Sequence, residues 1–289
     1  MKAHDEVSST EEFVAQRELL FAIVYNMLGS VADAEDVLQE TWLAWSGRSG
    51  VENPRAYLVR IAVNAALARR TTINRRKEEY VGPWLPEPVV TRIDPVERAE
   101  AVSLAMLVVL ETLTPLERAV FVLHEVFGYA HPEIAEIVDR TPAAVRQLAH
   151  RAREHVQARR PRYTADPLVQ LAVTQRFIDA VVGGDLNALM EVLAPDVTLW
   201  ADGGGKARAA GLRPVLGRDK IAPLIIGDGR RRPVRSLGIR YRAVNGDPSA
   251  LLLSGDTPFA VIVLEVEGDQ VTAIYAITNP DKLTRVAVD

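Results

Sequence analysis

The sequence predicts a multidomain protein with an all-α first half and an α+β second half. Hydrophobic residues recur at helical spacing up to about residue 160, whereas strand-like segments separated by Gly, Asp and Pro turns follow between residues 235 and 278. Two breaks divide the pattern, a Pro-rich stretch up to Pro95 and ARRPRYTADP at residues 158–167. With 289 residues, the chain is long enough for two or three domains, each with its own core.

Composition narrows the class of protein. The chain is 48% hydrophobic and 25% charged, and it contains no cysteine, which excludes disulfides and thiolate metal sites and fits a reducing cytoplasm. The first twelve residues have no apolar core and the longest apolar run, residues 101–110, is too short to span a bilayer. We therefore expect a cytoplasmic protein that does not bind membranes.

Charge is segregated along the chain although the net charge is only −4. Cations cluster at residues 69–77 and again at residues 146–162, and acidic residues cluster at residues 33–40. Each cluster alone is most simply a solvated face, but the arrangement predicts two nucleic-acid contacts and one protein contact.

Three helices are predicted in the first 74 residues. The first covers residues 11–28 and ends at Gly29, and the second starts at a capping-box-like pair, Ser30 and Asp33, and continues to Trp45. The second helix turns one polar face outward: Asp36, Gln39, Glu40 and Leu43. The third helix runs from Pro54 to about Arg70 after a flexible loop.

The third helix mixes cations with an aromatic and an amide side chain: Arg55, Tyr57, Arg60, Asn64, Arg69 and Arg70. In a single-strand reader, bases stack on aromatic rings, an amide reads a base edge, and cations follow the backbone. The alternative is that Tyr57 is partly core and the arginines are merely solvated.

A semi-extended linker is expected from residue 75 to residue 95, because its prolines forbid a continuous helix. Trp84 and Leu85 lie within it, and an exposed Trp-Leu pair is costly. We therefore expect this pair to dock on a domain surface.

Helices are expected again at residues 96–112 and 115–127, followed by a helix-turn-helix at residues 131–153. Thr141 is the expected N-cap of its second helix, with Pro142 at the first helical position. Helical spacing leaves these residues facing outward: Ala143, Arg146, Gln147, His150, Arg151 and Arg153. Short residues at the tip and long cations behind them suit a helix entering the major groove, although an ordinary helix pair in a bundle is the alternative.

The second half reads as two helices at residues 168–182 and 186–193, a strand at residues 197–203, a short helix at residues 217–226, and a run of antiparallel strands. All five histidines precede it, and its conceivable catalytic groups show no readable spacing: Asp179, Asp196, Asp202 and Tyr241. No catalytic residue, metal site or cofactor is therefore predicted. The DGGGK segment at residues 202–206 lacks the spacing of a phosphate-binding loop and is most simply a tight glycine turn.

Three of these segments resemble regions two and four of extracytoplasmic-function (ECF) sigma factors: DAEDVLQETWLAW, ENPRAYLVRIAVNAALARR and LTPLERAVFVLHEVFGYAHPEIAEIVDRTPAAVRQLAHRARE. The resemblance implies region two at residues 1–74, the linker at 75–95, and region four at 96–163. It implies that residues 33–45 bind the β′ coiled coil of core RNA polymerase, with the β flap as a second contact. The loop before Pro54, with Asn64, would hold flipped-out bases of the −10 element as a single strand, and the helix after Thr141 would read the −35 element as duplex.

Residues 166–289 resemble the SnoaL-like cone, a fold shared by cyclases and isomerases. WLPEP, DGGGK and an NPDKL-like tail are similar to motifs of an ECF subgroup that carries this extension. The resemblance implies that the extension regulates the sigma regions in cis, so that no separate anti-sigma factor is expected. The implied interdomain residues are Trp84, Leu85, Pro86, Asp202, Gly203, Gly204, Gly205, Lys206, Asn279, Pro280 and Asp281.

The sequence thus predicts a non-enzymatic sigma factor for promoter-specific initiation. Two alternatives stay open: a helix-turn-helix regulator that never contacts polymerase, and a SnoaL-like isomerase or cyclase with a DNA-binding module.

Overall fold

The chain is described by a computed structural model over residues 2–48, 50–91, 102–159, 165–207, 211–231 and 237–286. It divides into two compact units, which are described separately. The first contains residues 1–78 and 107–160, and the second contains residues 79–106 and 161–289. Among the described residues, no helix is both long and apolar enough to cross a lipid bilayer.

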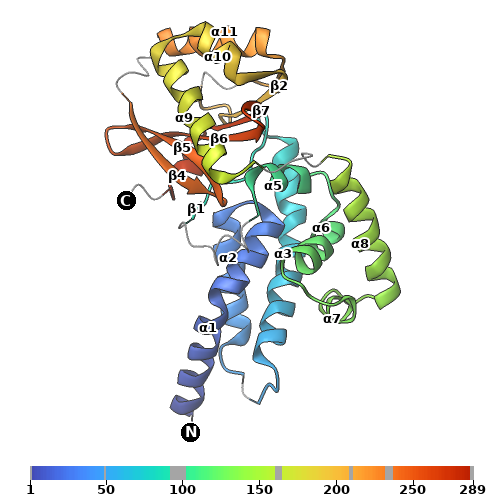
Figure 1. Ribbon diagram of the computed structural model, residues 1–289. Helices are drawn as coiled ribbons and strands as arrows, with labels where there is room; N and C mark the ends of the chain where they lie inside the picture. Colours follow the sequence, from blue (N-terminus) through green and yellow to red (C-terminus); the bar gives the residue numbers. More distant parts are fainter. Residues whose placement is uncertain are drawn as a thin grey trace. The chain divides into compact units, whose positions relative to one another are not determined.

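The first unit is helical (Figure 1). Its helices are α1 (Lys2–Leu28), α2 (Val31–Trp45), α3 (Pro54–Glu78), α5 (Leu104–Leu110, which begins in the second unit), α6 (Pro115–Phe121), the π-helix η1 (Val122–Val126), α7 (His131–Ile137) and α8 (Pro142–Gln157). Predicted starts are confirmed where a cap was expected: the Ser30 hydroxyl accepts from the Asp33 amide, and the Thr141 hydroxyl accepts from the Ala144 amide. Helices α1, α2 and α3 pack together, and α3 also contacts α6 and α7.

Two predicted boundaries in this unit are wrong. Helix α3 continues to Glu78 instead of ending near Arg70, and its last turn holds Arg75, Arg76 and Lys77. Cations are favourable there because the carbonyl end of a helix carries partial negative charge. The helix expected at residues 115–127 is divided into α6 and η1. The start of the helix expected at residues 96–112 lies outside the described residues, as do Arg160 and Arg162.

The second unit is an α+β domain built on a seven-stranded sheet of order β1-β4-β5-β6-β7-β2-β3. Its strands are β1 (Val90–Thr91), β2 (Leu193–Asp202), β3 (Val215–Leu216), β4 (Gly238–Val244), β5 (Asp247–Ser254), β6 (Thr257–Glu267) and β7 (Gln270–Ile277). Neighbours are antiparallel except β2 and β7, which are parallel. The expected run of antiparallel strands is confirmed for β4 to β7. Parallel neighbours need a long connection, and the chain between β2 and β7 supplies one with β3 to β6 and a helix before β7 returns alongside β2 in the same direction.

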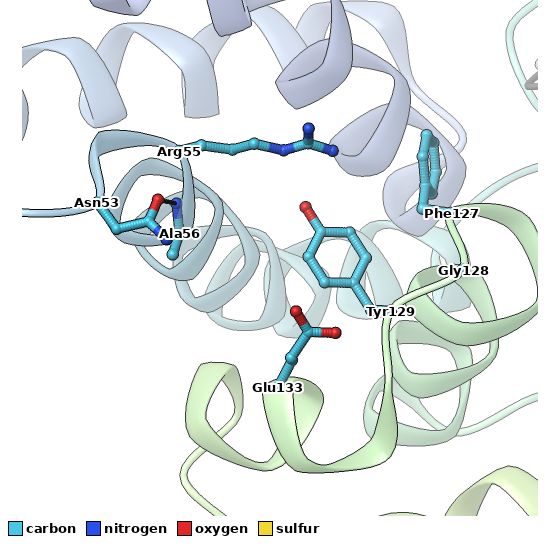
Figure 2. Close-up of a pocket in the computed structure, with 7 residues that line it drawn as sticks. All are labelled: Asn53, Arg55, Ala56, Phe127, Gly128, Tyr129 and Glu133. Atoms are coloured by element: carbon cyan, nitrogen blue, oxygen red, sulfur yellow. Dashed lines mark hydrogen bonds between the residues drawn. The ribbon is translucent and has the colours of Figure 1, made fainter.

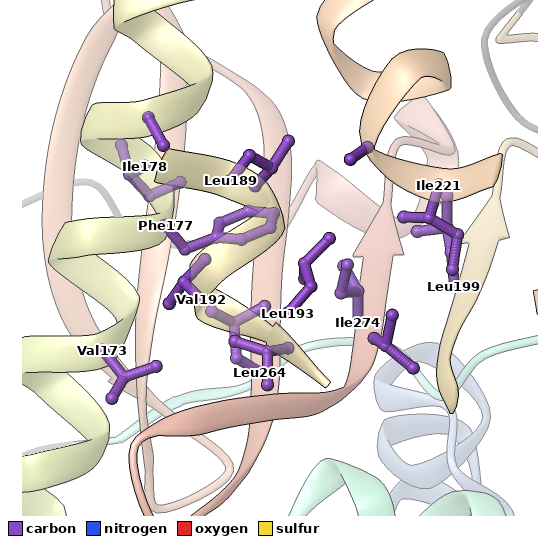
Figure 3. Packing of buried hydrophobic residues seen from close by; sticks show 14 of the residues in the cluster. Val173, Phe177, Ile178, Leu189, Val192, Leu193, Leu199, Ile221, Leu264 and Ile274 are labelled. Atoms are coloured by element: carbon purple, nitrogen blue, oxygen red, sulfur yellow. The ribbon is translucent and has the colours of Figure 1, made fainter. Parts of the chain in front are cut away.

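Helices α9 (Pro167–Gly183), α10 (Leu186–Val192) and α11 (Arg218–Arg231) cover one face of this sheet (Figure 1), and α12 (Pro280–Leu283) follows β7. Figure 3 shows side chains from α9, α10 and α11 meeting those of β2, β6 and β7. Phe177, Leu189, Ile221 and Leu264 are among the fully or almost fully buried residues of this core. The predicted cone is therefore closed by apolar packing between helices and sheet.

The Pro-rich segment belongs to this second unit. Its residues 90 and 91 form β1, which pairs with Val244 and Ala243 of β4, and Leu85 is fully buried. The prediction that the Trp-Leu pair docks on a domain is confirmed. Residues 92–95 of the expected linker lie outside the described part of the chain.

Candidate polymerase and nucleic-acid interfaces

The outward face of α2 is as predicted. Its four residues Asp36, Gln39, Glu40 and Leu43 are all exposed, and Leu43 is 71% exposed. The opposite side of the helix is buried through Ala34, Val37, Leu38, Thr41 and Trp45. An acidic face with one large apolar side chain at its end is suited to a protein partner.

Arg69 connects this acidic face to α3. Its Nε lies 3.0 Å from Asp33 Oδ1, its Nη1 lies 3.3 Å from Glu40 Oε1, and its Nη2 donates to Asp36. Burial alone would raise the pKa of Asp33, but hydrogen bonds from Arg76, Arg69 and Ser30 bring the pKa below its usual range. Arg69 is predicted to contact the −10 strand. It thus binds two carboxylates of the face predicted to contact polymerase, Asp36 and Glu40, as well as the buried Asp33.

The beginning of α3 presents the other predicted −10 residues. Asn53 accepts from the Ala56 amide at 3.0 Å and so caps the helix, while Arg55 and Arg60 are exposed. Tyr57 is half-buried against Trp45, with ring centroids 5.8 Å apart, so it is partly a core residue. The Asn64 amide donates to the Arg60 carbonyl and to the Ile137 carbonyl of α7, each at 2.8 Å.

Arg70 does not lie on an exposed face, contrary to its predicted position. It is 3% exposed, and its Nη2 lies 2.6 Å from Glu111 Oε2. Its Nη1 also donates to the Leu28 carbonyl at 3.0 Å. Its side chain is buried because it satisfies the last carbonyls of α1 and a carboxylate at once, so it cannot contact DNA in this conformation.

A cavity of about 380 Å³ lies between the start of α3 and the segment before α7 (Figure 2). It is lined by Asn53, Arg55, Ala56, Phe127, Gly128, Tyr129 and Glu133. Arg55 extends along one side and the Tyr129 hydroxyl points into the space (Figure 2). That hydroxyl is buried and has no hydrogen-bond partner among the described residues. The end of α3 that is predicted to read a single strand therefore faces the helix-turn-helix.

The helix-turn-helix consists of α7 and α8. Its turn contains Asp139 in a left-handed conformation, with φ of 53°. Ala143, Arg146, Gln147, His150 and Arg151 are exposed on α8, as predicted, and Thr141 is exposed at its start. The two rear cations are held by carboxylates of the same unit, since Arg151 pairs with Glu117 at 3.1 Å and Arg153 with Glu125 at 2.6 Å. Arg146 and Gln147 thus occupy the leading part of the helix and the ion-paired arginines the rear.

The three motifs of the second unit meet at Asp202, whose side chain is fully buried. Asp202 accepts from the Tyr80 hydroxyl, from the Leu85 amide at 2.8 Å and from the Lys282 amine at 2.7 Å. The Lys282 amine also lies 3.8 Å from the Trp84 ring centroid and 5.0 Å from that of Tyr80. A buried ammonium between two aromatic faces and a carboxylate is well compensated.

The glycines of DGGGK allow this close approach. Gly204 has φ of +57°, and a Cβ added there would lie 2.8 Å from Asn279 Cγ and 3.0 Å from the Tyr80 hydroxyl. A Cβ on Gly205 would lie 3.1 Å from Val81. Lys206 pairs with Asp281 at 2.5 Å, with both side chains exposed. Gly203 and Pro86 are buried, whereas Pro280 is exposed. The implied interdomain residues are therefore neighbours within one unit.

Three residues of these sites were not predicted from the sequence: Tyr80, Glu111 and Lys282. Lys282 lies inside the NPDKL segment, next to the predicted residue Asp281, so its position in the motif is a signal that could have identified it. Tyr80 carries no local signal, because its partner Asp202 is 122 positions away, and the pairing of Glu111 with Arg70 spans 41 positions.

Of the four conceivable catalytic groups of the second unit, Asp179 and Tyr241 are close enough to interact electrostatically. Asp202 is engaged with Tyr80, Leu85 and Lys282, and Asp196 is exposed. Burial raises the pKa of Tyr241, with a further contribution from Asp179. Within the described part of the chain, no three His, Cys, Asp or Glu side chains gather to hold a metal ion.

These features define a helical module with two promoter-binding regions and an appended α+β domain, the organisation of a sigma-70-type transcription factor. The model of Sigma-70 region 2 matches residues 13–76, and that of Sigma-70, region 4 matches residues 103–156. The ECF RNA polymerase sigma factor SigJ of Mycobacterium tuberculosis is 38% identical over 94% of this chain and 92% of its own length. The probable ECF RNA polymerase sigma factor SigI of the same species is 31% identical over 98% of this chain and 97% of its own length.

The crystal structure of M. tuberculosis SigJ matches with a TM-score of 0.77 at 34% identity, covering 97% of this chain and all of that one. The chain belongs to the ECF RNA polymerase sigma factors. It is a transcription initiation factor with a DNA-binding helix-turn-helix in region four and a C-terminal α+β domain. The resemblance and the predicted fold class are confirmed.

Proposed function

We propose that this sigma factor binds core RNA polymerase through the exposed face of α2 and promoter DNA through α3 and α8, while its C-terminal domain modulates these steps in cis. The observation that carries the proposal is the combination of Asp36, Gln39, Glu40 and Leu43 on one exposed helix face. A regulator that binds only DNA has no use for such a face. The work of the protein is then binding and strand opening, without covalent chemistry.

Promoter binding is assigned to two sets of residues. Arg55, Tyr57, Arg60, Asn64 and Arg69 would hold the −10 element as a single strand, with Arg70 joining them only after it leaves its buried position. Thr141, Ala143, Arg146, Gln147, His150, Arg151 and Arg153 would contact the −35 duplex. Exposure of Arg146 and Gln147 near the leading end of α8 supports base contacts there, and the rear arginines suit phosphates.

The proposal of regulation in cis rests on how the linker is held. Residues 80–91 join the C-terminal domain through β1, through buried Leu85 and through the Asp202 cluster. Since this segment stands between the two sigma regions in the sequence, the domain limits how far they separate. A built-in domain with this role would replace a separate anti-sigma factor.

Core binding is tested by pull-down of purified core polymerase, followed by runoff transcription. Leu43→Asp should reduce capture at least ten-fold, and Leu168→Asp, at an even more exposed leucine of the C-terminal domain, should not. Unchanged capture by Leu43→Asp would overturn the assignment of the α2 face. Duplex binding by the wild-type protein without any capture of polymerase would favour the polymerase-independent regulator.

DNA binding is tested with duplex −35 probes. Arg146→Ala should lower the discrimination between promoter and random duplex by about 1–3 kcal/mol if it contacts a base. Arg176→Ala, at an exposed arginine on α9, is the matched control. Trp84→Ala should change promoter-dependent transcription, because it weakens the hold of the C-terminal domain on the linker; no change would contradict regulation through this segment.

A further inference from the structure

Glu111 lies directly after α5 and contacts three cations. Its Oε2 accepts from Arg70 at 2.6 Å and from Lys77, and its Oε1 accepts from Arg118 at 2.6 Å. Arg118 is 1% exposed and Glu111 itself is largely buried. Arg70 lies within the match to region two and Lys77 directly follows it on α3, whereas Glu111 and Arg118 belong to region four. One carboxylate therefore joins the two promoter-binding regions.

The same arginines hold the end of α1. Arg70 donates to the Leu28 carbonyl at 3.0 Å, and Arg118 Nε donates to the Asn26 carbonyl at 2.8 Å. The carbonyl end of a helix carries about half a negative charge. Together with Glu111 it offsets part of the positive charge of these arginines. Arg118 Nη2 is buried without a hydrogen-bond partner among the described residues.

A second contact between the regions covers the predicted single-strand reader. The Asn64 amide donates to the Ile137 carbonyl, and Arg55 lines a cavity together with Tyr129 and Glu133 of region four. In this closed arrangement, the side-chain amide of Asn64, which is expected to read a base edge, donates to a backbone carbonyl instead. Residues of region four line the space next to Arg55 (Figure 2).

Removing the charge of Glu111 leaves buried cations facing one another, and a buried charge that loses its partner is strongly unfavourable. Burial alone would raise the pKa of Glu111, but Arg118, Arg70 and Lys77 hold the pKa well below its usual range. The carboxylate is therefore ionised throughout the physiological range. The closed arrangement depends on this charge in a way that apolar packing does not.

We propose that Glu111 is an internal substitute for promoter phosphate: it binds Arg70 of region two and the adjoining Lys77, holds region four over the −10 reader, and must be displaced before the promoter strand binds. This inference rests on the proposed roles of α3 and α8. It makes Glu111 a positioning residue that sets the population of the closed state, with single-stranded promoter DNA as its competitor.

The population of the closed state is measured directly by double electron–electron resonance between spin labels. The chain has no cysteine, so Glu52→Cys and Glu136→Cys provide two unique labelling sites on exposed positions of the two regions. Wild type should give one short, narrow distance distribution, and Glu111→Gln should give a longer, broader one. Glu154→Gln, at an exposed glutamate of α8, is the matched control and should resemble wild type. An unchanged distribution for Glu111→Gln would overturn the proposal.

The effect on binding follows from the populations. If about nine molecules in ten are closed, Glu111→Gln should strengthen binding of single-stranded −10 DNA by core-bound sigma up to about ten-fold. If Glu111→Gln opens the molecule while neither it nor the wild type captures polymerase, the role of Glu111 in closing the molecule is supported and the proposed function fails. If it opens the molecule and binding is unchanged, closure does not compete with DNA and the proposal is overturned.

A crosslink provides an independent test should Glu111→Gln fail to fold. Ala56→Cys and Glu133→Cys line the same cavity from the two regions. Joining them with a short reducible bismaleimide should abolish binding of −10 DNA, and cleaving the linker should restore it. Each single-cysteine variant treated with the reagent is the control. Full binding by the crosslinked protein would overturn the proposal.

Discussion

Glu111 and Asp202 are two buried carboxylates that join distant segments in opposite ways. Asp202 is surrounded by one cation, one phenol and one backbone amide, so its charge and its hydrogen-bonding capacity are both met. Glu111 is shared by Arg70, Lys77 and Arg118, and the Arg118 Nη2 has no hydrogen-bond partner within the described part of the chain. A balanced cluster stabilises one arrangement, whereas an unbalanced one is poised to exchange partners.

We call these two clusters, around Glu111 and around Asp202, the two joints of the molecule, and the difference between them indicates that the joint at Asp202 is the permanent one. Burial raises the pKa of Tyr80, and the hydrogen bond to Asp202 raises it further, so the phenol is a donor at every physiological pH. The linker is thus fastened to the C-terminal domain by groups that do not change state. The joint at Glu111 depends on charges that promoter phosphates also attract.

The largest effect is expected from Asp202→Ala. It leaves Lys282 buried without its carboxylate and removes the acceptor of two further donors, which should cost about 3–5 kcal/mol. Hydrogen exchange measured by mass spectrometry should show lost protection in peptides covering residues 80–91 and 278–286. Asp196→Ala, at an exposed position of β2, is the control, and equal protection in both variants would show that the cluster does not fasten the linker.

A smaller effect is expected from Gly204→Ala. The new methyl group meets Asn279 and Tyr80, and the left-handed φ adds backbone strain, for a total of about 1–3 kcal/mol. Gly268→Ala separates the two causes, because Gly268 has φ of +62° with nothing within 4 Å of an added Cβ. The difference in urea midpoint between the two variants measures the clash alone. Equal midpoints would mean that the motifs are not in tight contact.

The two joints should also respond to pH in opposite directions. Burial, with Arg70 and Arg118 nearby, lowers the pKa of Lys77 to about 7 although Glu111 opposes the shift. The unfolded chain then binds more protons than the folded one between about pH 7 and the ordinary value of 10.5, so the first unit should gain stability as pH rises through this window. The raised pKa of Tyr80 has the reverse consequence, and the second unit should lose stability above about pH 10.

Pulse-labelling hydrogen exchange along urea titrations reads the two units separately. Lys77→Met should abolish the gain in stability of the first unit with rising pH, without affecting the loss of stability of the second unit above about pH 10. Parallel pH profiles in wild type would contradict the contrast between the joints.

Local signals in the sequence were sufficient for the starts of α2 and α8 and for the exposed faces of these two helices. Ser30 and Thr141 cap helices because their hydroxyls reach amides three residues ahead, and the outward faces of α2 and α8 follow from helical spacing alone. Arg70 shows the limit of this reasoning. A cation within a basic run resembles a solvated or DNA-binding residue, and only the fold reveals that α1 and Glu111 bury it.

The Asp202 cluster was half predictable for the same reason. An unusual Trp-Leu pair among prolines indicated docking, and the glycines indicated a tight turn, but neither identifies the partner. Tyr80 and Lys282 are 122 and 80 positions from Asp202, so no periodicity connects them to it. The parallel pairing of β2 with β7 was missed because strand direction depends on the long connection between them.

The smallest effect is expected at the pair of Lys206 and Asp281, which lies next to the Asp202 cluster but in solvent. Their side chains are 55% and 64% exposed, so Lys206→Ala should change the urea midpoint of the second unit by no more than the equivalent of about 1 kcal/mol. Most of that small effect should vanish at about 1 M salt, where the screening length falls to about 3 Å. The effect of Asp202→Ala should persist under the same conditions, because its partners are buried. Equal salt sensitivity would mean that the cluster is open to solvent and that the linker is held no more firmly than region four is held by Glu111.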